Sequence, residues 1–436
     1  MSIIGAFVAG TTGINAQSQK LDATSDNIAN ANTVGYKPTE VLFKTLVIPT
    51  GAPTSLGASG PVPFNFAPGG VIPTPESRMD LQGLLTATQS STDLAISGRG
   101  FFAVTPSDQV TGSGTSSALA QGGEIAVTRA GSFIMNKDGQ LVNSAGFVLL
   151  GSPIGNTLPT SLTGLQPVAL TPGPNVTIGG TATTQVTING NLPATAAVGD
   201  TEQLSEGVFD SAGNSYALGL TFTNTGANTW SVAATSLTPT DPNSTVTATV
   251  TPASASLSFN SNGQLAASAN GLSLGTFNLS NGATLSPTFN LGTAGITGGF
   301  TQFGNAFASG SANIDGGGAA SRVSVTVTPD GVVSEVYSNG TVIPRFQVPV
   351  ITFPNAQGLE PLTGNAYLET QASGTATVNL PNTGGAGQIM PSELEQSAVD
   401  LATEFENMII SQSVFQANTK TITTADQMYQ LVTELR

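Results

Sequence analysis

The chain ends in a segment with a seven-residue repeat, SELEQSAVDLATEFENMIISQSVFQANTKTITTADQMYQLVTELR (residues 392–436). A large apolar side chain occupies every seventh position: Leu394, Leu401, Met408, Phe415, Ile422 and Tyr429. A straight helix drifts about 20° per seven residues, so such a row stays on one face only if the helix supercoils around a partner. Ser392 and Glu395 form a capping-box pattern that predicts where this helix begins.

The N-terminal segment has the same repeat, with Phe7, Ile14, Leu21 and Ile28. These four residues and the six above are the predicted assembly seam. A second row in each helix is small or polar: Gly10, Gln17, Thr24 and Ala31, and then Ser397, Glu404, Ser411, Asn418, Ala425 and Val432. Such rows suit close packing among several helices better than a strong isolated dimer. Because helices need tertiary packing to persist in water, we expect both to become ordered mainly on assembly.

A simpler interpretation exists for either end alone. Each helix could be amphipathic and could cover the β core of its own chain. The matching repeat at both ends favours a helix pair that packs against other copies.

Two segments rich in proline and glycine separate the helices from the interior. Residues 34–76 contain eight prolines, namely Pro38, Pro49, Pro53, Pro61, Pro63, Pro68, Pro73 and Pro75. A shorter counterpart, residues 371–391, precedes the last helix. This composition predicts extended connectors without a core of their own.

The interior has the turn signals of antiparallel strands. Asn-Gly or Asp-Gly pairs begin, among other positions, at Asp138, Asn189, Asn262, Asn281, Asp330 and Asn339. From Asp138 to Ser321 there is no basic residue, which indicates a separate domain inserted into another.

The predicted fold class is therefore mainly β with helical termini, in which discontinuous nested β domains accompany a long N- and C-terminal coiled-coil pair. The predicted division is an axial helical domain (1–33 and 392–436), connectors (34–76 and 371–391), an inner β domain (77–151 and 314–370) and an outer inserted β domain (152–313).

Composition excludes much chemistry. The 436 residues include no His and no Cys, so imidazole and thiolate metal sites, His-based triads and disulfides are absent. With 11 Lys+Arg against 26 Asp+Glu, the net charge of −15 disfavours nucleic acids and anionic lipid surfaces. No apolar run is long enough for a membrane helix, and the first lysine is Lys20, which argues against a Sec-type signal peptide.

Three short motifs could carry chemistry, but the first is better explained as the entry into a strand and the other two as turns. Ser97-Gly98-Arg99-Gly100 lacks the spacing of a phosphate-binding loop and leads into a strand pattern. The segment 136–139 (NKDG) lacks the acidic ligands of a calcium loop. The segment 210–214 (DSAGN) has no second acid within the turn. We therefore predict no catalytic, cofactor or metal residues.

The stretch LDATSDNIANANTVGYK (21–37) resembles the N-terminal signature of bacterial flagellar rod and hook proteins. The segments 399–409, 416–418, 420–422 and 426–428 are similar to the C-terminal signature of that family. Gly98 to Phe102 and residues 128–142 resemble its β-domain motifs. The matching positions that we single out are Asn27, Asn30, Asn32, Gly35, Gly98, Gly100, Phe101, Phe102, Asn418, Asp426 and Gln427.

This resemblance implies a structural subunit and not an enzyme. Distal rod proteins are much shorter, so the length favours a hook-type member, with a rod or hook–filament junction component as the alternative. The resemblance further implies export through the flagellar type III apparatus without a cleaved signal, and polymerisation into a curved extracellular tube that serves as a universal joint. The implied partners are other copies of the chain together with rod, hook-cap, junction and export proteins.

Two hypotheses from other classes remain. The Thr, Ser, Asn and Gly content of the middle would also suit a secreted β-rich adhesin or glycan-binding module. An enzyme with an unusual carboxylate site is disfavoured because no histidine exists to relay protons.

Overall fold

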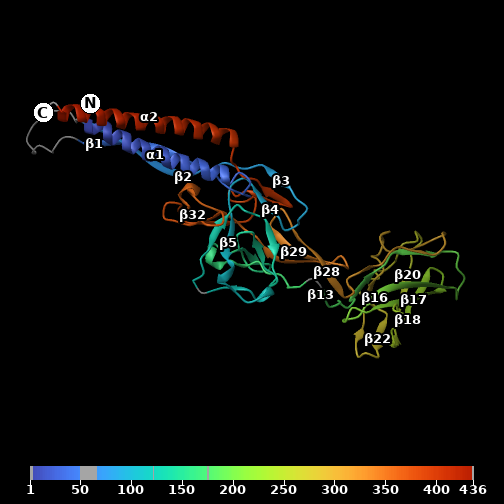
Figure 1. Cartoon of the computed structure of the whole chain (residues 1–436). Helices are drawn as coiled ribbons and strands as arrows, with labels where there is room; N and C mark the ends of the chain where they lie inside the picture. The colour runs from blue at the N-terminus through green and yellow to red at the C-terminus, as the bar shows by residue number, and fades with distance from the viewer. Residues whose placement is uncertain (1–2, 50–65, 121, 174–175, 435–436) are drawn as a thin grey trace, which may run out of the picture. The chain divides into compact units, whose positions relative to one another are not determined.

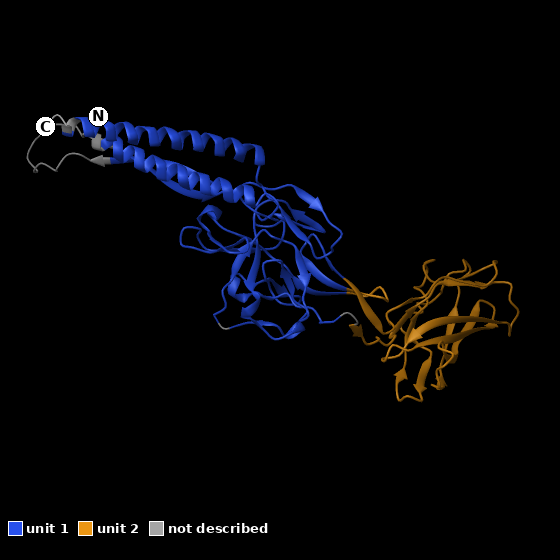
Figure 2. Ribbon diagram, in the orientation of Figure 1, with its two compact units in different colours: residues 1–173, 325–335, 343–436 blue, residues 174–324, 336–342 orange. Residues whose placement is uncertain are grey.

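The computed structural model describes residues 3–49, 66–120, 122–173 and 176–434. Two helices, α1 (Ile3–Ala29) and α2 (Leu401–Glu434), lie side by side, and nearly all other regular elements are strands (Figure 1). This confirms the predicted fold class, mainly β with helical termini. By contacts, the chain forms two units: residues 1–173, 325–335 and 343–436, and residues 174–324 and 336–342 (Figure 2).

The prediction that the last helix begins at Ser392 is wrong. Ser392 has a φ of +56°, and residues 393–395 form a strand, β36 (Glu393–Glu395), which pairs with β3 (Leu85–Ala87). The helix is instead capped by Asp400, whose Oδ1 accepts a hydrogen bond from the Ala402 amide at 2.9 Å. Leu394 consequently lies in a strand and cannot belong to the helical row.

The first predicted connector is a β-hairpin. Strands β1 (Thr39–Pro49) and β2 (Phe66–Ser77) pair in antiparallel register and pack along α1. The Val71 amide donates to Thr12 Oγ1 at 3.3 Å. A two-stranded ribbon has two free edges, so prolines that lack an N–H donor are tolerated in it. Residues 50–65, with Pro53, Pro61 and Pro63, lie outside the described residues.

The first unit contains a mainly antiparallel β domain. Its central strands are β5 (Phe102–Pro106), β8 (Ala126–Thr128), β11 (Phe147–Pro153) and β33 (Ala366–Leu368), with β32 (Glu360–Leu362) beside β33. Around them lie β4 (Leu94–Ser97), β6 (Val110–Thr111), β7 (Ala118–Leu119), β9 (Phe133–Met135), β10 (Leu141–Asn143), β12 (Gln166–Pro167), β30 (Val342–Gln347) and β31 (Val350–Thr352). Alternating apolar residues of these strands fill two buried clusters.

The second predicted connector, residues 371–391, also belongs to this domain. Strand β34 (Thr377–Asn379) pairs with β31, and β35 (Gln388–Pro391) pairs with β4. Ile389 is fully buried in the core. The glycines and prolines here form tight turns between short strands, and composition alone does not distinguish such turns from a linker.

The second unit has its own core around Trp230. A four-stranded sheet holds β16 (Thr201–Phe209), β17 (Ser215–Gly226), β18 (Thr229–Pro239) and β20 (Ser254–Ser258). The other strands are β13 (Thr177–Ile178), β14 (Gln185–Thr187), β15 (Gly190–Pro193), β19 (Ala248–Pro252), β21 (Leu272–Ser273), β22 (Gly275–Leu279), β23 (Thr284–Leu285), β24 (Thr288–Asn290), β25 (Phe300–Phe303), β26 (Ala308–Ser309) and β27 (Asn313–Ile314).

The turn signals and domain bounds differ from the structure in detail. Asn189-Gly190 joins β14 to β15, which pair in parallel with β24 and β25 and not with each other. The second unit begins at residue 174 rather than 152, because β12 pairs with β11 of the first unit. Three strands contain residues of both units: β28 (Ala320–Val327), β29 (Val332–Tyr337) and β30, whose first residue Val342 belongs to the second unit.

Candidate assembly interface

The two helices run antiparallel. Gly10 and Gly13 of α1 lie against Ile422 and Asn418 of α2, whereas Asn27 near the other end of α1 is hydrogen-bonded to Glu404. Residue numbers thus rise along one helix where they fall along the other. This antiparallel arrangement gives the predicted coiled-coil pair its geometry.

The closest approach of the helices uses the small and polar row. A Cβ atom at Gly10 would lie 2.7 Å from Ile422 Cγ1, and one at Gly13 would lie 2.8 Å from Asn418 Nδ2. Ser411 and Ala425 on α2 are fully buried. Small side chains let the two helix backbones approach each other. The row of small and polar residues on α2 is therefore the one that α1 covers.

The predicted seam residues fall into three groups. The α1 residues Phe7, Ile14, Leu21 and Ile28 and the α2 residues Met408, Phe415 and Ile422 are half-buried. Leu401 and Tyr429 are exposed. Leu394 lies in β36, as described above.

Pairing with α1 leaves many apolar side chains of α2 partly exposed within the described residues. Eight of them are between 37% and 64% exposed, and we call them the apolar surface of α2: Leu401, Phe405, Ile409, Ile410, Val414, Met428, Tyr429 and Leu431. They lie on several sides of the helix, so pairing with α1 leaves most of its apolar character in water. Six of these eight lie outside the sevenfold row and were therefore not predicted: Phe405, Ile409, Ile410, Val414, Met428 and Leu431. The hairpin adds Leu42, Phe43, Leu46, Val47 and Ile72, which are also exposed.

Asn27 of the family signature ties the end of α1 to both neighbouring segments. Its side-chain Nδ2 donates to the Thr39 carbonyl and to Glu404 Oε1, each at 2.9 Å. Its Oδ1 accepts from the Thr39 amide at 2.9 Å and from the Tyr36 hydroxyl at 3.1 Å. With an exposed fraction of 2%, Asn27 uses its donors and its acceptor inside the fold. Its role in the single chain is therefore to join α1, β1 and α2.

The other residues of the N-terminal signature shape the chain where it leaves α1. Asn30 Nδ2 donates to the Asp26 carbonyl at 2.9 Å, while Asn32 is exposed. Gly35 has a φ of +68°, and a Cβ atom there would lie 2.6 Å from the carbonyl carbon of Arg129. Only glycine fits this position without backbone strain.

Three buried charges join the terminal segments to the β domain. Glu395 Oε1 lies 2.6 Å from Lys37 Nζ, and Glu395 Oε2 lies 2.9 Å from Arg129 Nη1. Each of the three side chains is at most 4% exposed. Burial lowers the pKa of Lys37 and that of Arg129, and the Glu395 carboxylate opposes both shifts. We call Lys37, Arg129 and Glu395 the charged joint.

The remaining signature residues have structural or surface positions. Gly98 and Gly100 have φ values of +103° and +127°, and Phe101 and Phe102 are buried in the two cores of the first unit. On α2, Asn418 faces Gly13, Asp426 Oδ2 accepts from Gln430 Nε2 at 3.1 Å, and Gln427 is exposed.

The motifs considered for chemistry are turns. Asp210 Oδ1 accepts from the amides of Ala212 and Asn214, and Asn136 Oδ1 accepts from those of Asp138 and Gln140. Across residues 3–49, 66–120, 122–173 and 176–434, no three acidic groups are placed to hold a metal ion. Neither helix in that part of the chain is long and apolar enough to cross a bilayer.

The partly buried Glu404 predicts a dependence on pH. Burial raises its pKa, and the hydrogen bond from Asn27 opposes the rise. A carboxyl whose pKa is raised by folding stabilises the fold below its unfolded pKa and loses this contribution as the pH rises through its folded pKa. Because we expect α2 to be ordered mainly in the polymer, tubes of Glu404→Gln, which keeps an acceptor for Asn27, should melt at a higher temperature than wild-type tubes at pH 7. The two melting temperatures should converge below about pH 4. If the difference persisted there, it would not come from the titration of Glu404.

Comparison with known protein families matches residues 8–37, 95–316 and 390–435 to flagellar families. The matching descriptions are "Flagella basal body rod protein" (residues 8–37), "Flagellar hook protein FlgE/F/G D1 domain" (95–191), "Flagellar basal body protein FlaE D2 domain" (181–316) and "Flagellar basal body rod FlgEFG protein C-terminal" (390–435). The first of these covers residues 8–29 of α1, and the last contains α2.

Full-length relatives give the same result. The chain is 32% identical to the flagellar hook protein FlgE of Rhizobium meliloti, over 100% of both chains. It is 30% identical to FlgE of Escherichia coli, over 99% of this chain and 100% of that protein. The crystal structure of the Helicobacter pylori flagellar hook protein FlgE2 has a TM-score of 0.52 at 16% identity, covering 71% of this chain and 100% of that one. The last comparison supports the fold alone.

Proposed function

Since this chain belongs to the flagellar hook protein family, we propose that it is a structural subunit of the flagellar hook that polymerises through the apolar surface of α2. The family is structural, and the chain is not an enzyme. Its location is the flagellar hook. The exposed apolar side chains on several sides of a paired helix carry the proposal, because a monomer gains nothing from them in water.

The expected gain from burying this surface is large enough to drive assembly. Complete burial of one large apolar side chain contributes about 1.5–3 kcal/mol. Association costs roughly 4–15 kcal/mol in lost freedom of motion. Eight half-exposed side chains on α2 and further ones on the hairpin can together offset that cost. The row of small and polar residues has a different role in assembly. It sets how α1 packs against α2, and thereby which apolar side chains of α2 stay exposed for a second copy.

The finer assignments rest on the resemblance of both termini to rod and hook proteins. We propose that copies of the chain form a curved, flexible tube with the helices towards its channel. Its other partners would be rod, hook-cap and hook–filament junction proteins. The chain would be exported through the flagellar type III apparatus. A rod or junction component is the alternative. Matches over the full length of several hook proteins, including the FlaE D2 region within the second unit, favour the hook.

A single exposed side chain tests the proposal. Ile409 is 64% exposed, so Ile409→Asn should leave the monomer as stable as the wild type. In the polymer the same change loses apolar burial, and the subunit concentration needed for polymerisation should rise about tenfold or more. Light scattering and negative-stain microscopy measure both properties.

The matched control is Gln412→Asn, an exposed polar position three residues further along α2. It should polymerise at the wild-type concentration. Equal polymerisation of Ile409→Asn and wild type would mean that this part of α2 stays in water.

A further inference from the structure

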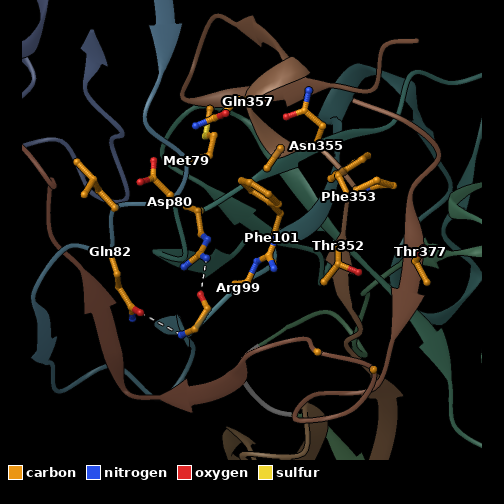
Figure 3. Close-up of a pocket in the computed structure, with 18 residues that line it drawn as sticks. Met79, Asp80, Gln82, Arg99, Phe101, Thr352, Phe353, Asn355, Gln357 and Thr377 are labelled. Atoms are coloured by element: carbon orange, nitrogen blue, oxygen red, sulfur yellow. Dashed lines mark hydrogen bonds between the residues drawn. The ribbon is translucent and has the colours of Figure 1, made fainter. Parts of the chain in front are cut away.

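The first unit contains a pocket of about 750 Å³ beside the charged joint (Figure 3). Four stretches of chain line it, residues 79–82, 98–101, 352–357 and 384–385, together with Arg129 and Thr377. Its charged lining residues are Asp80, Arg99 and Arg129. The pocket therefore has two cations and one anion, in a protein with few cations elsewhere.

Arg129 is buried but incompletely satisfied. Its Nη1 donates to the Ile96 carbonyl at 3.1 Å and to Glu395, and its Nη2 donates to the Gly98 carbonyl at 2.5 Å. Its Nε is buried and has no hydrogen-bond partner in the described part of the chain. Its guanidinium lies over the Phe101 ring, 5.5 Å from the ring centre. The charged joint holds two cations and one anion, so one positive charge remains at this wall of the pocket.

Arg99 adds a second positive charge at the same pocket. It is exposed, and within the described residues its side chain makes no hydrogen bond or ion pair. Asp80 does not neutralise it, because both Asp80 oxygens accept from Arg78, at 3.1 and 3.0 Å. Glu40 also accepts from Arg78, at 2.7 Å. Asp80 and Glu40 thus share the cation Arg78, whereas the side chain of Arg99 has no partner in the described part of the chain.

We propose that this pocket receives the carboxylate of an Asp or Glu side chain from a second copy of this chain. The inference rests on the proposed polymerisation and names one contact within it. Each copy has 26 acidic and 11 basic residues, so copies repel one another unless scarce cations meet acids across the contact. Arginine is suited to this role because its planar guanidinium binds a carboxylate through two parallel hydrogen bonds.

The first experiment compares Arg99→Gln with Lys137→Gln. Lys137 is a matched control because it is an exposed cation that already pairs with Asp138 in its own chain. Arg99→Gln should raise the concentration needed for polymerisation at least about tenfold, as expected for a lost charge-assisted contact. Lys137→Gln should leave that concentration within about twofold of the wild type. Circular dichroism melts of both monomers should match the wild type.

The second experiment identifies the partner. Arg99→Lys keeps the charge and supplies an amine that a zero-length carbodiimide joins to a carboxylate in contact with it. Tubes assembled from a mixture of ¹⁵N-labelled and unlabelled Arg99→Lys chains should yield one cross-link between peptides of opposite label. That cross-link should join position 99 to an Asp or Glu of another copy.

Three results would overturn the proposal: wild-type polymerisation by Arg99→Gln, cross-links from position 99 only within one chain (for example to Asp80), or failure of Arg99→Lys to polymerise where Arg99→Gln succeeds. Each leaves the proposed function standing if wild type polymerises and Ile409→Asn does not. Failure of the wild type to polymerise would instead contradict the proposed function.

Discussion

A chain that ends at Asp400 is expected to stay monomeric at every concentration at which the full chain forms tubes. The deletion removes all of α2, and with it the eight exposed side chains of the apolar surface and the partner that covers Gly10 and Gly13 of α1. Since one buried apolar side chain contributes about 1.5–3 kcal/mol, losing the whole surface should shift polymerisation by many orders of magnitude. Sedimentation velocity and negative-stain microscopy measure the outcome.

The truncated chain should nevertheless keep its β domains. It retains β36 and Glu395, so the charged joint stays intact. A shorter chain that ends at Glu393 provides a contrast, because it leaves Lys37 and Arg129 buried without their carboxylate. We expect the first truncation to melt close to the wild-type temperature and the second to melt well below it. Normal tubes from either truncation would refute assembly through α2.

The second large effect is expected for Glu395→Gln, which removes the only anion of the charged joint. Removing one partner of a buried ion pair typically costs about 3–5 kcal/mol, because the remaining charge stays buried without compensation. Here two cations, Lys37 and Arg129, would be left, so we expect a loss of stability at the upper end of that range. Urea unfolding followed by circular dichroism measures the free energy of unfolding of the first unit.

The control for this variant lies two residues earlier in the same strand. Glu393→Gln changes an acid that pairs with no cation in the described residues, so its effect should stay within about 0.5 kcal/mol of the wild type. If Glu395→Gln were as stable as Glu393→Gln, the charged joint would contribute nothing to holding the termini on the β domain.

Patterns that repeat along the chain could be predicted from the sequence. The sevenfold rows of Phe7 to Ile28 and Leu401 to Tyr429 indicate paired helices, and the structure contains the pair. Turn pairs such as Asp138-Gly139 and Asn281-Gly282 lie between strands that pair with each other. Each of these signals is local in sequence. Neighbouring residues of a sevenfold row are two helical turns apart, and the two residues of a turn pair are adjacent.

Features that depend on distant partners could not be predicted. Lys37 and Glu395 are 358 residues apart, and no spacing rule connects them. The same contact explains the error at Ser392, since the capping-box pattern there is overridden by β36, which carries Glu395 into the joint. The predicted connector at residues 34–76 is wrong where β1 and β2 form, because composition does not reveal that α1 supplies a surface for these two strands to pack on.

The expectation that the terminal helices become ordered mainly on assembly stays a prediction, and polymerisation through α2 depends on it. Hydrogen–deuterium exchange of the backbone amides of α2, compared between monomer and polymer, tests it most directly. The predicted result is rapid exchange along residues 401–434 in the monomer and strong protection in the polymer, while amides of the β cores are protected in both. Protection of α2 in the monomer equal to that of the β cores, without change on polymerisation, would contradict the ordering of α2 on assembly.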